Sequence, residues 1–84
     1  MTEKEIRAAT RLAVRKATGK APQGKNLQLL ESCGDSSNAY NWIYMRVLCR
    51  LYGQIVTIYY DAMINPDSSH KIQAIANVRI DTAA

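Results

Sequence analysis

Residues 43–64 read IYMRVLCRLYGQIVTIYYDAMI, and apolar side chains occupy every second position in both halves of this stretch. They stand at the odd positions of residues 43–51 and at the even positions of residues 56–64. Because a period of two sends alternate side chains to one face of a sheet, each half is predicted to be a half-buried strand. A tight turn at residues 52–54 would join the two strands into an antiparallel hairpin.

The alternation returns after a polar loop at residues 65–70. The even positions carry Ile72, Ala74, Ala76, Val78 and Ile80, which predicts a further strand with these side chains facing inward. Leu27 and Leu29 begin either a fourth strand or an apolar loop under the sheet. Residues 33–38, which are rich in Gly, Asp, Ser and Asn, are predicted to form a turn or loop.

A helix is the competing interpretation of residues 38–52. Ser37 or Asn38 would cap that helix, and its apolar stripe would consist of Ile43, Val47, Leu48 and Leu51. The unbroken alternation and the concentration of Trp, Tyr, Ile and Val favour the strand, since these residues pack well on pleated surfaces.

The amino-terminal segment has the pattern of an amphipathic helix. Thr2 and Glu5 have the spacing of a capping box, and Gly19 is placed to end the helix in the left-handed conformation. The apolar face, with Ile6, Ala9, Ala13 and Ala17, consists mostly of alanine. We therefore expect this helix to lie close against the sheet, with a linker at residues 20–26 leading into the first strand.

These segments predict one small α+β domain over residues 1–84, in which an amino-terminal helix packs on a three- or four-stranded antiparallel sheet ending in a β-meander. No apolar run is long enough to cross a bilayer, and the amino terminus lacks the apolar core of a signal peptide. We therefore expect a cytoplasmic protein with no membrane partner. Cys33 and Cys49 are expected to be reduced thiols, with one disulfide between them as the alternative.

The positive charge of the chain is concentrated at its amino terminus. Residues 1–25 hold seven Lys or Arg and two Glu, a net charge of +5, whereas residues 26–84 carry −1. This asymmetry is typical of a protein with a polyanionic partner.

Four of the basic residues form a ridge on the predicted helix. Lys4, Arg7, Arg11 and Arg15 recur at intervals of three and four residues, and Lys20 and Lys25 extend the charge into the linker. Such a ridge attracts phosphates through counterion release, without any base-reading motif. A solvated helix face is the plain alternative, but like charges at i and i+4 repel by about 0.2–0.5 kcal/mol per pair. An anionic partner would relieve that repulsion.

The predicted outward face of the sheet mixes aromatic, apolar and basic side chains. The candidates for a protein interface are Tyr44, Leu48, Ile55, Tyr59 and Ile75, and the basic residues there are Arg46 and Arg50. Tyrosines between arginines can stack bases and hold phosphates. The apolar members favour a protein interface instead, so we expect a homodimer through this face.

No catalytic or metal site emerges from the residue spacings. His70 lies in a polar loop beside Ser68 and Ser69, where it is typical of a solvated side chain, and no triad can be assembled around it. Two cysteines and one histidine do not supply a closed zinc site. We expect no enzymatic activity, cofactor, metal or small-molecule substrate.

The sequence therefore predicts a small binding protein whose basic helix engages nucleic acid. Arg46 and Arg50 join the helix cations as candidate contacts. The alternative is a small inhibitor or adaptor whose basic ridge complements an acidic surface on one protein partner.

Overall fold

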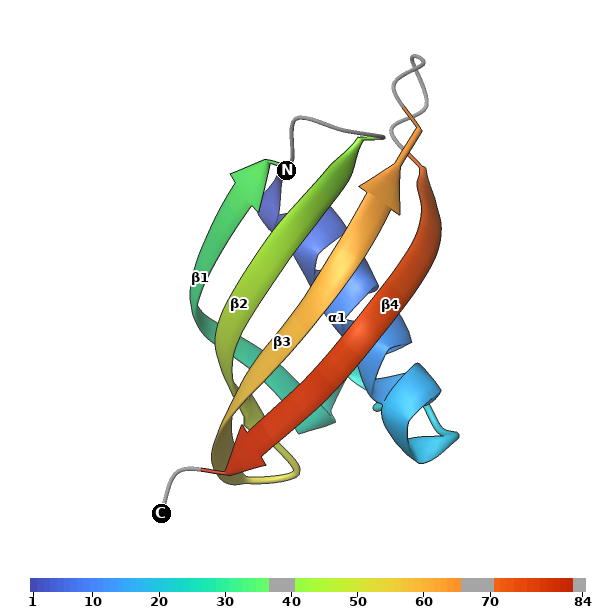
Figure 1. The fold of residues 1–84 in the computed structure, drawn as a ribbon. Helices are drawn as coiled ribbons and strands as arrows, with labels where there is room; N and C mark the ends of the chain where they lie inside the picture. Colours follow the sequence, from blue (N-terminus) through green and yellow to red (C-terminus); the bar gives the residue numbers. More distant parts are fainter. Residues whose placement is uncertain (37–40, 66–70, 83–84) are drawn as a thin grey trace.

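The alternating segments of the chain become neighbouring strands of one antiparallel sheet (Figure 1). The computed structural model describes residues 1–36, 41–65 and 71–82. Its elements are a helix α1 (Glu3–Thr18), a short 3-10 helix η1 (Gly24–Asn26) and the strands β1 (Leu27–Ser36), β2 (Trp42–Leu51), β3 (Gln54–Ile64) and β4 (Ile72–Thr82). The strand order β1-β2-β3-β4 confirms the α+β meander, with four strands and with Leu27 and Leu29 in the first of them.

The helix begins and ends at the residues that the sequence predicts. The Thr2 hydroxyl accepts a hydrogen bond from the Glu5 N–H at 3.2 Å, and the Glu5 carboxylate accepts one from the Thr2 N–H at 2.9 Å. Gly19, with φ 87°, ends the helix in the left-handed conformation and donates its N–H to the Arg15 carbonyl. Among the described residues, no helix is long and apolar enough to span a membrane.

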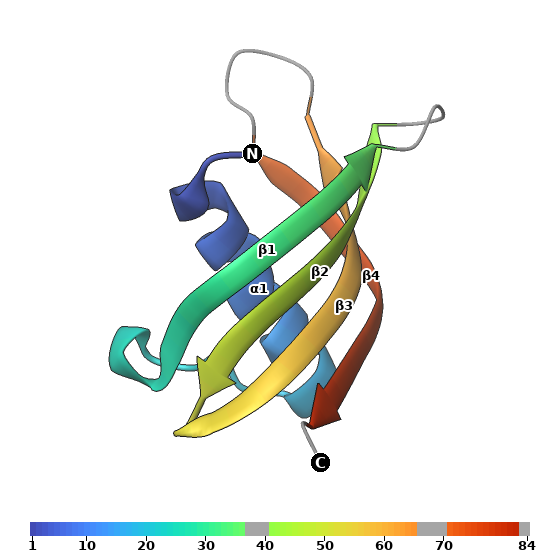
Figure 2. The ribbon, with the colours of Figure 1, turned by 90° about the vertical axis from the view of Figure 1, so that its left-hand side faces the viewer.

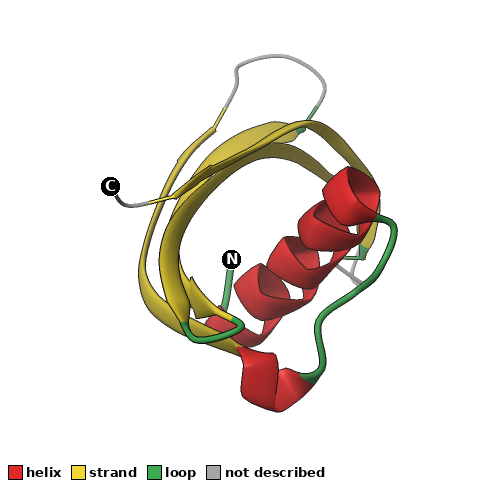
Figure 3. Ribbon diagram, turned by 90° about the horizontal axis from the view of Figure 1, so that it is seen from below, coloured by secondary structure: helices red, strands yellow, loops and turns green. Residues whose placement is uncertain are grey.

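The sheet curls around α1, which lies in its concave side (Figures 2 and 3). Ala9 and Ala13 are fully buried against the sheet, as the alanine-rich face predicts. The strands contribute the larger core side chains, which are Leu27, Met45, Val47, Cys49, Val56, Ile58 and Tyr60. Because the alanine side chains of this helix face are small, the helix packs close to the sheet. One helix is then enough to cover the core.

One polar pair lies inside this apolar core. The Thr10 hydroxyl is 2.7 Å from the Ile6 carbonyl, to which it donates, and 2.9 Å from the Tyr60 hydroxyl. Since the Thr10 proton goes to the carbonyl, Tyr60 is the donor of the second bond. Burial raises the pKa of Tyr60 to about 12, so its hydroxyl stays protonated even where an exposed tyrosine would ionise. The pair therefore ties α1 to β3 with no polar atom left unsatisfied.

The helical interpretation of residues 38–52 is wrong, because residues 42–51 form β2. Strands β2 and β3 are joined by a two-residue turn between the paired residues Leu51 and Gln54. Tyr52 and Gly53 both have positive φ, 49° and 81°, and such turns match the twist of the flanking strands.

The expectation of a turn or loop at residues 33–38 is wrong for residues 33–36, which belong to β1. Gly34 occupies a position in β1 that leaves no room for a side chain. A Cβ atom on Gly34 would lie 2.6 Å from the Met45 sulfur, because the Met45 side chain covers this point of the strand. Residues 37 and 38 lie outside the described residues.

The expected facing of β4 is wrong for residues 74–76, whereas Ile72 faces inward as expected. Asn77, at φ 54°, is an extra residue between the pairs Tyr59–Arg79 and Asp61–Ala76. An extra residue reverses the alternation, so Ile75 turns into the core at 8% exposure, while Ala74 and Ala76 face outward opposite Met63 and Asp61. Ile75 therefore does not belong to an outward interface. Asn tolerates positive φ, which is the physical reason for the bulge at this position.

This reversal predicts opposite outcomes for two neighbouring substitutions. Ile75→Lys should lower the free energy of unfolding by about 3 kcal/mol or more, because it buries an unpaired charge. Ala74→Lys should change it by less than about 0.5 kcal/mol, since this side chain faces outward. Urea denaturation measures both values. Equal tolerance of the two lysines would contradict the bulge.

Candidate functional site

The linker folds back along the helix and is held there by two arginines. Arg11 donates from Nε to the Pro22 carbonyl at 2.9 Å, and Arg7 donates to the Gly24 carbonyl. The order of these contacts, with Pro22 beside Arg11 and Gly24 beside Arg7, means that the linker runs antiparallel to α1. Pro22 is buried as a result.

This arrangement brings the sequence-predicted cations of the helix and linker to one side of the molecule. We call this side the helix–linker face, and its cations are Lys4, Arg7, Arg11, Arg15, Lys20 and Lys25. Among the described residues, none of these six lies within ion-pair distance of a carboxylate. Their positive charge is therefore not neutralised by ion pairs within the described residues.

Arg46 and Arg50 lie elsewhere, on the side of the sheet that α1 does not cover. Arg46 pairs with Cys33 and Tyr59, and Arg50 pairs with Gln28 and Ile55. Because residues directly opposite on neighbouring strands share a face, all of these point away from the helix. The candidate contacts of the sequence thus fall into two groups on opposite sides of the sheet.

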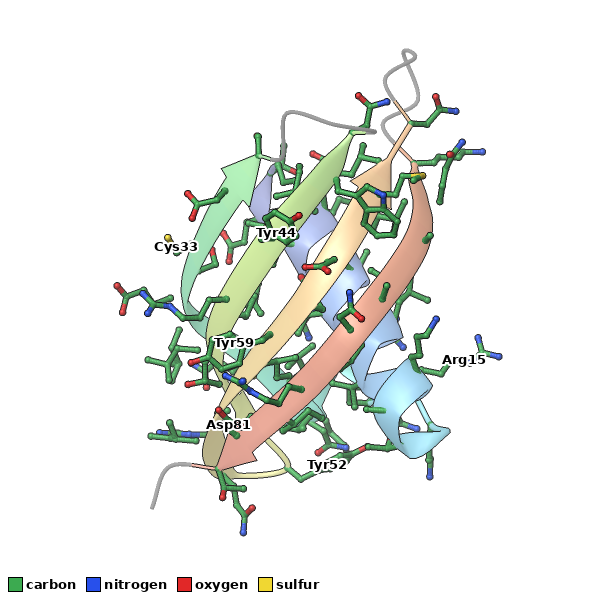
Figure 4. All side chains as sticks on the ribbon, in the orientation of Figure 1. Arg15, Cys33, Tyr44, Tyr52, Tyr59 and Asp81 are labelled. Carbon is green, nitrogen blue, oxygen red and sulfur yellow. The ribbon has the colours of Figure 1, made fainter. Side chains whose placement is uncertain are left out.

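The outer sheet face, defined as the side of the sheet opposite α1, has a nearly balanced charge. Its basic residues are Arg46, Arg50 and Arg79, and its acidic residues are Glu31, Asp35, Asp61 and Asp81. Arg79 stacks on the Tyr59 ring at 4.2 Å and pairs with Asp81 at 3.3 Å. Tyr59 and Asp81 appear together in Figure 4, near the lower end of the sheet.

Apolar side chains stand between these charges. Tyr44 is 52% exposed and Ile55 is 42% exposed, while Leu48 and Tyr59 are half-buried. The structure adds Trp42 and Met63, which face each other across β2 and β3 on the same side. The sequence could have indicated that Trp42 faces outward, because its residue number is even, like those of the outward residues Tyr44 and Leu48. The face is a mixed polar and aromatic surface, typical of protein contacts.

A depression of about 170 Å³ lies in the outer sheet face. Its lining includes Glu31, Cys33, Arg46, Leu48 and Tyr59, so it places an acid, a thiol and a guanidinium around an apolar floor. Cys33 is exposed there, whereas Cys49 is buried on the helix side of the sheet. The two thiols therefore lie on opposite sides of the sheet.

No metal-binding group of three His, Cys, Asp or Glu occurs among residues 1–36, 41–65 and 71–82. His70, the residue considered as a general base, lies outside the described residues. Two acids of the outer sheet face have side-chain partners: the Asn77 amide donates to Asp61 at 2.8 Å, and Arg79 pairs with Asp81.

In comparisons with known protein families, with curated proteins and with solved structures, no match to this chain was found. The helix–linker face and the outer sheet face are therefore the features from which a function can be inferred.

The linker contacts predict that substitutions of two arginines in α1 have different effects on the free energy of unfolding. Arg11→Gln should lower the free energy of unfolding by about 1 kcal/mol, because it removes the bond to the Pro22 carbonyl. Arg15→Gln should leave stability within about 0.5 kcal/mol. Thermal unfolding compares the two, and hydrogen exchange should show faster opening of residues 20–26 in the first variant alone. Indistinguishable variants would mean that the linker does not depend on Arg11.

Proposed function

We propose that this protein is a non-enzymatic, cytoplasmic nucleic-acid-binding protein. Its helix–linker face would contact phosphates, and its outer sheet face would form a homodimer. The exposed Cys33 thiol, remote from the buried Cys49, suits a reducing compartment.

The observation that carries the proposal is the docking of the linker along α1. It adds Lys20 and Lys25 to the row of helix cations, so that two antiparallel segments present positive charge on one side. Phosphate backbones bind such a surface because condensed counterions are released. No base-reading element is needed for this mode, and none is proposed.

Two of the cations are held in place before any ligand arrives. Arg7 and Arg11 each donate to a linker carbonyl, and the remaining N–H groups of both guanidiniums stay free to donate elsewhere. A side chain that is already ordered loses less entropy on binding, which favours affinity. The hydrogen bonds to carbonyls leave the charge of both arginines intact.

The balance of charge indicates which face would form the dimer. A two-fold interface brings the same patch together twice, so that patch must be complementary to itself. The outer sheet face, with three arginines and four carboxylates, meets this requirement, whereas the helix–linker face would repel its copy.

The second candidate function is an inhibitor or adaptor that binds one protein partner. It is favoured by the exposed Tyr44 and Ile55, whose side chains are typical of protein contacts. In that case the helix–linker face would meet an acidic protein surface instead of phosphates.

The nucleic-acid proposal predicts that the salt dependence of binding comes from the helix–linker face alone. Replacing Lys20 and Lys25 by Gln should reduce the slope of log K against log salt by about two units, close to one for each lost phosphate contact. Replacing Arg46 and Arg50 by Gln removes the same charge from the opposite face and should leave the slope unchanged. Fluorescence anisotropy with labelled single- and double-stranded DNA and RNA measures both.

If the parent chain shows no salt-sensitive binding to any of these nucleic acids at low ionic strength, the proposal is wrong. A pull-down from native lysate, with and without nuclease, then tests the second candidate. A single stoichiometric protein that survives nuclease treatment would support the inhibitor or adaptor function.

The dimer proposal predicts about twice the chain mass in light scattering at micromolar concentration. Ile55→Lys should shift the mass toward that of the monomer, since it places a charge at an exposed apolar position of the interface. Leu12→Lys is the matched control, because Leu12 is 40% exposed and lies on α1, on the other side of the sheet. A parent chain that stays monomeric at high concentration would exclude the dimer.

A further inference from the structure

A groove of about 520 Å³ runs between the carboxyl-terminal half of α1 and strand β4. The helix contributes Leu12, Arg15 and Lys16, and the strand contributes the continuous segment Ile72, Gln73, Ala74 and Ile75. In Figure 1 this half of the helix extends past β4, beyond the last strand of the sheet, and Figure 4 shows Arg15 pointing outward there. The groove lies apart from the outer sheet face and shares Arg15 with the helix–linker face.

The lining shows that the groove follows the edge of the sheet. A groove lying on one face of the sheet would be lined by residues of that face alone. This one is lined by Ile72 and Ile75, which face the helix side, and also by Ala74, which faces outward. Since β4 is the outermost strand, the backbone edge of the sheet is turned toward the groove. An edge of this kind can pair with an added strand.

The walls of the groove supply apolar contacts. Ile72 and Ile75 both face the helix side, because Gln73 is an extra residue in the register between them. On the other wall Leu12 is 40% exposed, although it lies on the side of α1 next to β4. A segment lying in the groove would cover Leu12 and remove apolar surface from water.

The charge of the lining is one-sided. Arg15 and Lys16 are its charged side chains, and the remaining residues are apolar apart from Gln73. An occupant with carboxylates would therefore meet complementary charge, whereas a basic one would be repelled.

We propose that this groove binds an extended acidic segment of a partner protein, which adds to β4 as a fifth strand. Main-chain hydrogen bonds to the edge of β4 would provide affinity. Side chains on one face of the segment would contact Leu12, Ile72 and Ile75, and its carboxylates would lie near Arg15 and Lys16. This inference goes beyond the nucleic-acid proposal, since it concerns the edge of β4 and another class of partner, with Arg15 as the one cation common to both surfaces.

The test begins with a display library of random decapeptides, panned on the intact chain. Peptides that alternate apolar and acidic residues should be enriched, and their synthetic forms should lose affinity when Asp and Glu are replaced by Asn and Gln. Leu12→Gln should weaken the best peptide about fivefold or more, since it removes an apolar contact and keeps the helix propensity. Leu30→Gln, a similarly exposed leucine outside the groove, should not weaken it.

Hydrogen exchange of the backbone amides is a second measurement, which tests strand addition directly. Strand addition should slow amide hydrogen exchange within residues 72–75 by about tenfold or more when the peptide is bound. Enrichment of no peptide, equal binding by Leu12→Gln, or unchanged exchange in this segment would each overturn the proposal. A fall in the mass of the chain itself on Leu12→Gln would overturn it as well, because the occupant would then be a second copy.

Leu12→Gln does not alter charge on the helix–linker face, so nucleic-acid binding should persist in this variant. Failure of the groove proposal and failure of the nucleic-acid proposal are therefore distinguished by separate measurements.

Discussion

The close contact between α1 and the concave side of the sheet is the constraint on which the rest of the structure depends. Ala9 and Ala13 leave no surface exposed, and the Thr10–Tyr60 hydrogen bond satisfies the polar pair within the contact. With larger side chains at the alanine positions the helix would stand farther from the sheet, and the strands could not curl around it. One side of the sheet is thereby covered, and the other is left to solvent.

The position of the helix also decides where the charge lies. The linker must return from the end of α1 to the start of β1, and Arg7 and Arg11 hold it against the helix on the way. The cations of both segments therefore gather on the helix side, whereas the outer sheet face keeps a near balance of acids and bases. Because α1 extends past β4, the same placement leaves a groove beside the edge strand. Three different surfaces thus follow from one packing contact.

Most of the candidate site could be recognised from residue spacing, but its grouping could not. The helix cations have helical periodicity, and the outward positions of β2 and β3 have strand periodicity, so both sets were visible in the sequence. Arg46 and Arg50 were grouped with the helix cations as candidate contacts, although the alternation of residues 43–51 predicts that both face outward. The helix packs against the opposite side, and this separates the two sets.

The sequence by itself determined the local structure: the capped helix, the hairpin turn and the alternation of β2 and β3. These features depend on interactions between residues close in the chain, or on a regular exchange between core and solvent. Only the tertiary structure decided the facing of Ile75, the strand at residues 33–36 and the docking of the linker. Ile75 turns inward because Asn77 adds a residue to β4, and residues 33–36 form a strand because they pair with residues 43–46 of β2. The extra residue is defined by the pairing of β4 with β3, and residues 33–36 and the linker depend on β2 and α1, so all three are set when the sheet closes around the helix.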